Sequence, residues 1–239
     1  MILERIVAEV FGENCYFLAA DPSTTAVVVD PGSGTAPAVG NALERHGLTL
    51  GCVLLTHGHP DHVWDAAAVA GVAPVYIAEP DLYRLENPLA GSPLALGMVG
   101  LFPQPWTRPA NVQTLRPEFF AGGGSELVPG VALRALPAPG HTEGSTVYFL
   151  EAEWPGAVAQ WVGEPAAHGT QPLALTGDVI FRGSIGRVDL PGGDADVMMW
   201  TLRTLKQVVD PRTWLLPGHG QGTTMAHELA TNPFLASRR

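Results

Sequence analysis

The chain of 239 residues is 46% hydrophobic and 15% charged, so it can bury a sizeable core and does not have the composition of a disordered protein. Its 13 basic and 23 acidic residues give a net charge of −10, which opposes binding to nucleic acid and disfavours a nuclease. No stretch approaches about 18 uninterrupted apolar residues, and Glu4, Arg5 and Glu9 interrupt the apolar N-terminus, so we expect neither a membrane span nor a signal peptide. These features predict a cytoplasmic protein without a nucleic-acid or membrane partner.

Alternating or continuous apolar runs predict strands, and apolar residues at helical spacing predict helices. The expected strands cover residues 2–10, 14–20, 24–29, 52–55, 75–77, 131–136, 145–150, 173–175 and 214–216. The expected helices cover residues 36–46, 64–70, 81–86, 194–208 and 225–230. Prolines and glycines predict irregular excursions at about 80–124 and 151–172, within a single domain that spans 1–239. Because the strands come in two batches that are each followed by helices, we expect a layered α/β domain of two packed sheets with helices outside.

The densest chemical signal is the sequence T-H-G-H-P-D-H at 56–62, which directly follows an apolar run. Gly58 and Pro60 prevent a simple continuation of strand or helix, so we expect a tight turn at the end of a strand. The potential metal ligands in this turn are His57, His59, Asp61 and His62. The spacing H-x-H-x-D-H arises by chance in roughly one such chain in a few thousand. A histidine-rich sequestering tract is disfavoured because the flanks are apolar, so the pattern predicts a metal site.

Three further polar residues, each flanked by glycine, follow other predicted strands. They are His141 in P-G-H, Asp178 in T-G-D and His219 in P-G-H-G. Any one of them alone is typical of an ordinary turn residue. Their shared placement at strand ends predicts that they meet the first cluster and complete its metal site.

The order and spacing of these motifs resemble the metallo-β-lactamase superfamily, and Asp30 in V-V-V-D-P-G matches the early structural aspartate of that family. The resemblance covers essentially the whole chain and implies a four-layer αββα sandwich with the metals at one edge of the two sheets. It implies that His57, His59 and His141 bind a first metal, that Asp61, His62 and His219 bind a second, and that Asp178 bridges them. The expected cofactors are two divalent ions, zinc first, with iron or manganese as alternatives because the same ligands accept all three.

The segment 177–194, G-D-V-I-F-R-G-S-I-G-R-V-D-L-P-G-G-D, is similar to that of glyoxalase II-like hydroxyacylglutathione hydrolases, as are N-C-Y at 14–16 and T-N-P-F at 231–234. The chain resembles their short, single-domain branch. This implies a dinuclear thioesterase that cleaves S-2-hydroxyacyl-glutathione, or the ester of another small thiol, with a hydroxide that bridges the metals. Asp61 and Asp178 are then the expected catalytic residues. Arg182 and Arg187 are candidates to bind a substrate carboxylate, although a salt bridge to Asp189 or Asp194 is an equally good account of such an arginine.

Three other functions compete with this hypothesis. Antibiotic hydrolysis is not expected, because the true β-lactamases usually lack the His62 equivalent or place cysteine where Asp178 stands. The main alternative is a persulfide dioxygenase, which uses one iron bound by two histidines and one aspartate. A non-catalytic scaffold is disfavoured because no ligand position is lost. Cys15 and Cys52 lie in apolar runs without C-x-x-C spacing, so we expect two buried thiols.

Overall fold

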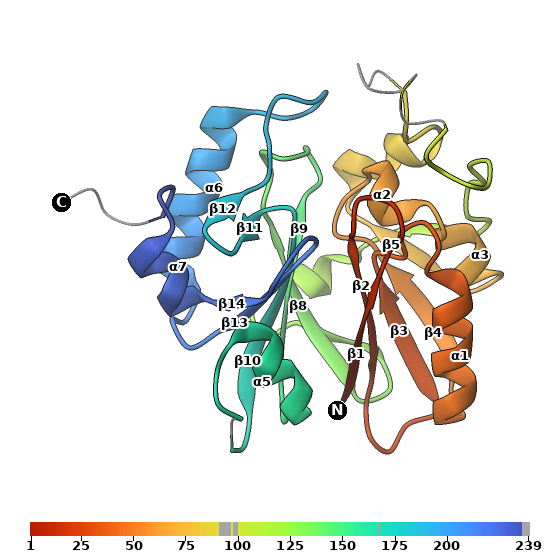
Figure 1. The fold of residues 1–239 in the computed structure, drawn as a ribbon, viewed down its shortest axis with the longest axis horizontal. Coiled ribbons are helices and arrows are strands. Elements are labelled where there is room, and N and C mark those ends of the chain that lie inside the picture. The colour runs from red at the N-terminus through yellow and green to blue at the C-terminus, as the bar shows by residue number, and fades with distance from the viewer. Residues whose placement is uncertain (91–96, 98–99, 167, 236–239) are drawn as a thin grey trace.

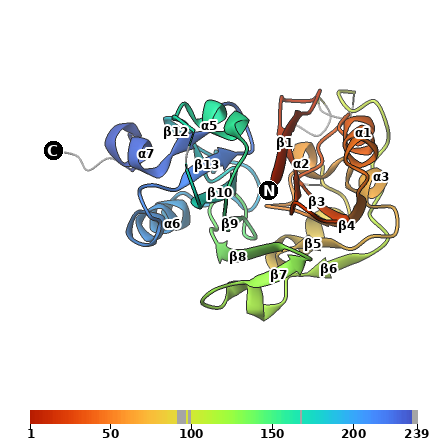
Figure 2. The same ribbon diagram turned by 90° about the horizontal axis from the view of Figure 1, so that it is seen from below.

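The computed structural model describes residues 1–90, 97, 100–166 and 168–235. Two sheets lie face to face in the middle of the molecule, and helices lie on the outer side of each (Figure 1). The view from below shows α1 and α3 beyond the first sheet and α6 and α7 beyond the second (Figure 2). This arrangement confirms the predicted four-layer αββα sandwich. Among the described residues, no helix has the length and hydrophobicity that crossing a membrane requires.

The first sheet comes from the N-terminal half of the chain and has the order β1-β2-β3-β4-β5-β6. Its strands are β1 (Ile2–Val7), β2 (Asn14–Ala19), β3 (Thr25–Val29), β4 (Thr49–Leu54), β5 (Val75–Ile77) and β6 (Val112–Thr114). The pairs from β1 to β3 are antiparallel, and those from β3 to β6 are parallel. Side chains alternate along β2, so that Tyr16 and Leu18 face the second sheet while Phe17 and Ala19 face the helices. This sheet is therefore buried on both faces.

The second sheet has the order β14-β13-β10-β9-β8-β7. Its strands are β7 (Ser125–Val128), β8 (Val131–Pro137), β9 (Thr146–Ala152), β10 (Gln171–Gly177), β13 (Trp214–Pro217) and β14 (Thr223–Thr224). A separate hairpin joins β11 (Ile180–Phe181) and β12 (Ser184–Ile185). Only β10 and β13 run parallel in this sheet, with Gly177 opposite Pro217. The residues that follow these two strands, Asp178 and Gly218, consequently leave the sheet side by side.

The two longest helices each bury one largely apolar face. They are α1 (Ala36–His46), α2 (Pro60–Val63), α3 (Ala66–Ala70), α5 (Gly156–Val162), α6 (Ala195–Val208) and α7 (Met225–Thr231), with 3-10 turns η1 (Glu79–Leu85) and η2 (Pro117–Phe120). The predicted helices at 36–46 and 194–208 are confirmed. Asp194 caps α6 by accepting a hydrogen bond from the Val197 backbone N–H, and Met198, Leu202 and Leu205 form its buried face.

The structure is more regular than the sequence predicts in three places. The turn at 57–62 continues into α2, because Pro60 occupies the first helical position, where its missing N–H costs nothing. The expected irregular excursion at 80–124 contains η1, β6 and η2, although residues 91–96 and 98–99 lie outside the described residues. The excursion at 151–172 contains α5. Strand β6 and helix α5 are short and lie between prolines and glycines, so neither is long enough to establish a hydrophobic period.

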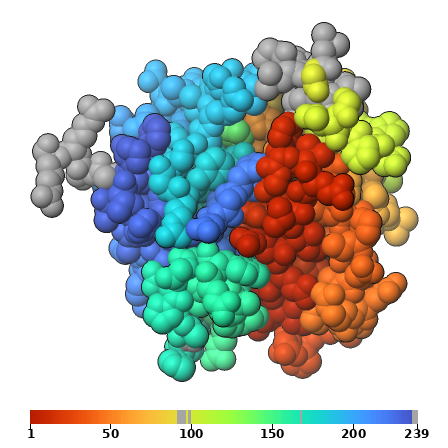
Figure 3. Space-filling model, in the orientation of Figure 1, coloured from red at the N-terminus to blue at the C-terminus, as the bar shows by residue number. Residues whose placement is uncertain are grey.

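Two buried tyrosines join the sheets. The Tyr16 hydroxyl on β2 donates to the Pro217 carbonyl at the end of β13, at 2.7 Å. The Tyr148 hydroxyl on β9 donates to the Leu55 carbonyl just after β4, at 2.8 Å. Each sheet therefore holds the other at a carbonyl that immediately precedes a histidine-bearing turn. On the surface of the molecule, the β1–β2 hairpin packs against the segment that follows β13 (Figure 3).

Candidate metal centre

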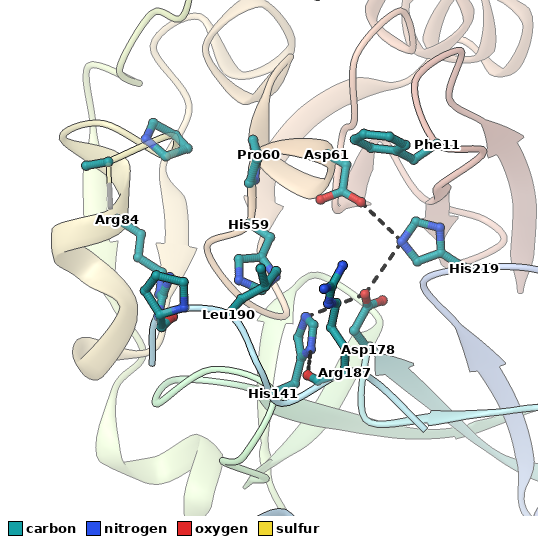
Figure 4. A pocket seen from close by; sticks show the side chains of 13 residues that line it. Phe11, His59, Pro60, Asp61, Arg84, His141, Asp178, Arg187, Leu190 and His219 are labelled. Carbon is teal, nitrogen blue, oxygen red and sulfur yellow. Dashed lines mark hydrogen bonds and ion pairs between the residues drawn. The ribbon is translucent and has the colours of Figure 1, made fainter. Parts of the chain in front are cut away.

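Five strands deliver the predicted metal ligands to one edge of the two sheets. Figure 4 labels His59, Asp61, His141, Asp178 and His219 among these ligands. Strand β4 leads into the turn with His57 and His59, and α2 follows with Asp61 and His62. The β8–β9 turn carries His141, β10 ends just before Asp178, and β13 ends just before Gly218 and His219. The ligand-bearing turns gather because parallel neighbours end at the same edge and the two sheets are packed with those edges together.

The ligand atoms fall into two triads. The first triad is His57, His59 and His141, and the second triad is Asp61, His62 and His219. Within each triad, the ligand atoms lie within 4.8 Å of one another. Asp178 lies between the triads. Its Oδ2 is 3.5 Å from Nε2 of both His141 and His219, and its Oδ1 is 3.3 Å from Nε2 of His62. The structure thus brings together all seven residues that the sequence singled out, in the two groups that the family resemblance implies.

Several of these buried atoms lack a hydrogen-bond partner, which fits them for metal ions. Nε2 of His57, Nε2 of His141 and Oδ1 of Asp178 make no hydrogen bond with any described residue. The Nε2 atoms of His62 and His219 face each other at 3.3 Å. Leaving buried polar atoms unpaired costs free energy. A cation in each triad would satisfy them, since neutral imidazole and carboxylate are ligands for divalent metals.

Hydrogen bonds on the outer nitrogens orient three of the histidines toward the site. The His141 Nδ1–H donates to the Arg187 backbone carbonyl at 2.7 Å, and His62 Nδ1 contacts Asp30 Oδ2 at 3.0 Å. The Thr56 hydroxyl donates to Asp30 at 2.5 Å, so it must accept from His57 Nδ1, at 3.0 Å. Each contact leaves Nε2 directed at the triads, and partners of this kind fix the ring orientation of metal ligands.

Electrostatics keeps His57 and His59 of the first triad neutral. Burial, together with the neighbouring histidines, lowers the pKa of His57 well below its ordinary value. Burial and the nearby His141 lower the pKa of His59 to about 3. Both rings are therefore unprotonated at neutral pH, the state in which imidazole binds a metal.

The carboxylates of the site stay ionised. Burial alone would raise the pKa of Asp178, but His62, His141 and His219 outweigh burial and hold this pKa below its ordinary value. Burial likewise opposes ionisation of Asp61, yet His62 and His219 keep its pKa lowered. Without bound metal, the countercharge is the imidazolium of His62, whose pKa the carboxylates of Asp178 and Asp61 raise against the effect of burial. A divalent cation supplies the same countercharge and releases that proton.

A cavity of about 300 Å³ opens onto the two triads (Figure 4). Its lining residues are Phe11, His59, Pro60, Asp61, Arg84, Pro88, Ala90, His141, Asp178, Arg187, Leu190, Pro191 and His219. The sequence did not single out Phe11 or Arg84. Phe11 lies at the tip of the β1–β2 hairpin, is 53% exposed and has a φ of +59°, a conformation that a bulky residue rarely adopts. The one available signal in the sequence was the adjacent Gly12, because glycine is common in hairpin turns.

The two arginines proposed from the sequence differ in their placement. Arg187 reaches the cavity wall, but its guanidinium is bound in bidentate fashion by Asp189, at 2.7 and 2.8 Å, as in the alternative account of this residue. Arg182 contacts Gln221 at 3.4 Å and does not line the cavity. Arg84, in η1, is instead the other arginine of the wall and is largely buried.

Sequence comparison agrees with this geometry. A family profile described as the Metallo-beta-lactamase superfamily matches residues 8–153, which is more than half of the chain. The chain belongs to the metallo-beta-lactamase superfamily. Its membership and its His/Asp clusters make it a metal-dependent hydrolase of that superfamily, with a site able to hold metal ions whose identity is open.

Relatives within the superfamily match the chain from end to end. Hydroxyacylglutathione hydrolase GloC of Haemophilus influenzae is 31% identical over 243 residues, which cover 100% of both chains. The solved structure of BLEG-1, named a B3 metallo-beta-lactamase, has a TM-score of 0.74 and 29% identity, and covers 99% of this chain and 100% of its own. The structure of TTHA1623 in a di-iron-bound form has a TM-score of 0.71 and 29% identity, and covers 97% of this chain and 100% of its own.

Proposed function

We propose that the protein is a dinuclear metal-dependent thioesterase that cleaves S-2-hydroxyacyl-glutathione or the ester of a similar small thiol. The observation that carries the proposal is the full-length likeness to a hydroxyacylglutathione hydrolase, combined with two complete triads that meet at Asp178. A metallo-β-lactamase superfamily site can serve other chemistries, so the substrate class is the proposed part.

The residues have separate tasks in this proposal. His57, His59 and His141 would hold one metal, Asp61, His62 and His219 the other, and Asp178 both. When bound, divalent ions of this kind lower the pKa of water from about 15.7 towards ~7 and polarise a carbonyl group. Zinc is the expected metal, with iron or manganese as alternatives, and the di-iron form of TTHA1623 makes iron a concrete candidate.

The cavity fits an acyl group with a polar thiol part. Phe11 and Leu190 offer apolar surface beside the metal ligands, while Arg84 and Arg187 place cationic groups in its wall. Asp61 Oδ2 lies 3.2 Å from His219 Nε2. At this position Asp61 can both bind metal and orient an attacking water. The leaving thiolate has a thiol pKa near ~8.5, so it departs without a strong general acid.

The test combines metal analysis with turnover on one purified sample. We expect close to two metal ions per chain and hydrolysis of S-lactoyl-glutathione. Asp178→Ala should remove nearly all of this activity, whereas Asp210→Ala, at an exposed aspartate paired with Arg212, should not. Near-normal turnover of Asp178→Ala would refute the assignment of Asp178 to both metals.

Two other substrates distinguish the competing functions. Hydrolysis of a β-lactam without thioester turnover would replace the proposal with the activity named for BLEG-1. One iron per chain with oxygen consumption on a thiol persulfide would establish the dioxygenase instead. Two metals with turnover of a different thioester would retain the thioesterase and change only the thiol or the acyl group.

A further inference from the structure

Asp81 is a buried carboxylate that lies behind the metal ligands without belonging to them. It sits in η1, its side chain is 0% exposed, and its two oxygens accept four hydrogen bonds. Oδ2 accepts from the Gly58 N–H and the Thr142 hydroxyl, both at 2.8 Å. Oδ1 accepts from the Gly144 N–H at 2.7 Å and from Arg84 Nε at 3.2 Å. Four donors match the four lone-pair positions of an ionised carboxylate.

Three of these donors, all but Arg84, come from the two turns that carry the first triad. Gly58 lies between His57 and His59, and Thr142 directly follows His141. Asp81 Oδ2 therefore bonds to both turns at once. Among the hydrogen bonds that the described residues make, none joins the Asp81 side chain to α2 or to the turn of His219. The carboxylate thus contacts the surroundings of the first triad and not those of the second.

The packing around Asp81 is so close that the position of this side chain affects the neighbouring turns. A Cβ added to Gly144 would lie 2.6 Å from the Cβ of Asp81, so this turn needs glycine to approach the carboxylate. A Cβ added to Gly58 would lie 2.7 Å from the Arg84 side chain. Arg84 Nη2 in turn donates to Glu143 at 2.5 Å and to the Pro191 carbonyl at 2.9 Å. The guanidinium balances the charge of Asp81 and extends the network to the cavity wall.

We propose that Asp81 is the positioning residue of the first triad: it fixes the separation of the His57–His59 turn from the His141 turn and thereby sets the affinity for the metal held there. The inference rests on the proposed function only in requiring a metal at that triad. Asp30 lies differently, because it contacts His62 of the second triad directly and bonds to Thr56, which contacts His57. Its carboxylate forms with His57 and His62 a group whose ligand atoms lie within 4.8 Å of one another, so Asp30 lies beside both triads.

The test is Asp81→Asn, which keeps the shape of the side chain and exchanges one acceptor for a donor. Whichever way the amide is turned, its NH₂ group faces a backbone N–H, that of Gly58 or that of Gly144. Partners behind metal ligands typically contribute 10–100-fold to affinity. We expect one of the two zinc dissociation constants, measured by competition with a chromogenic chelator, to rise by about 10–100-fold, and the other to stay unchanged.

A matched control is Glu228→Gln. Glu228 is also 0% exposed and accepts from the Gly183 N–H, the Thr223 hydroxyl and Asn232 Nδ2, but it supports α7 and the β11–β12 hairpin. Both variants should lower the stability of the metal-free protein towards urea. Only Asp81→Asn should change a zinc dissociation constant. If Asp81→Asn does not fold, Thr142→Val removes one of the same hydrogen bonds and should weaken the same zinc ion to a smaller extent.

The outcomes separate this inference from the proposed function. Unchanged zinc dissociation constants in Asp81→Asn, or in Thr142→Val when the first variant does not fold, would overturn the inference alone. Equal weakening of zinc in Glu228→Gln would also overturn it, because general destabilisation would then account for the effect. An unaltered protein that binds no zinc, iron or manganese would refute the dinuclear function itself.

Discussion

The two tyrosine hydroxyls that join the sheets should differ in their contribution to stability, and the structure gives the difference. In Tyr148→Phe the Leu55 carbonyl loses its hydrogen bond, and it accepts no other from the described residues. A buried carbonyl left unsatisfied costs about 1–3 kcal/mol, so we expect a loss of ~2 kcal/mol in the free energy of unfolding. In Tyr16→Phe the Pro217 carbonyl keeps the bond from Asn14 Nδ2 at 3.0 Å. Only the net value of one hydrogen bond is then lost, ~1 kcal/mol.

The assay is equilibrium urea unfolding of the metal-free protein, followed by far-UV circular dichroism, for both variants in parallel. Metal is left out so that its binding does not add to the apparent stability. Both substitutions delete one buried hydroxyl from a tyrosine that bridges the sheets, so each serves as the control for the other. A Tyr16→Phe variant that loses as much stability as Tyr148→Phe would refute the argument that the second donor at Pro217 matters.

Three further predictions concern single residues. Phe11→Gly removes the cost of a positive φ, so the free energy of unfolding should change by only about 0–1 kcal/mol. KM for the thioester should rise several-fold at constant kcat. A large loss of stability with unchanged KM would contradict a contact between Phe11 and the substrate. Burial raises the pKa of Cys52 to about 12, above the ~8.5 of a thiol in the unfolded chain. The contribution of Cys52 to the free energy of unfolding is therefore complete below pH ~8.5 and falls by about 1.4 kcal/mol per pH unit above it. Cys52→Ala should therefore flatten the decline of unfolding free energy between pH ~8.5 and ~10.5, and equal slopes would exclude this origin. Gly218→Ala would place a Cβ against Asp178 Oδ1 and His62 Cε1. The variant should therefore fold, but elemental analysis should find at least one metal ion fewer per chain. Retention of both ions at full occupancy would show that the turn can shift.

The sequence predicts the positions of the metal ligands better than the surroundings of the metals. His141, Asp178 and His219 each follow an apolar strand and a glycine, and strand ends are recognisable without knowledge of tertiary contacts. Asp81 carries no such signal, because three of its four donors come from turns that are distant in sequence from η1. Phe11 was missed for a related reason, since a backbone angle cannot be read from residue type. Local patterns therefore indicate which residues form the site, while the contacts that position them depend on the complete fold.

The regular elements follow the same rule. The helix at 36–46 was predicted with its observed bounds because it is amphipathic and ends at Gly47, which adopts a left-handed conformation. Strand β6 was not predicted, since Val112–Thr114 is only three residues long and gains its identity by pairing with β5. Arg182 and Arg187 were selected for their charge and their place just beyond Asp178. The alternative account of Arg187, a salt bridge to Asp189, is confirmed, whereas Gln221, the partner of Arg182, was not predicted.

The division of each triad between the sheets has a consequence for how the protein matures. The N-terminal half supplies His57, His59, Asp61 and His62, whereas His141 and His219 come from the second sheet. During synthesis, the emerging N-terminal half thus carries two incomplete sets of ligands. In the proposed function, neither triad is complete until the second sheet has formed, and the second triad also needs the turn that follows β13. Binding of both metals would then follow the docking of the second sheet.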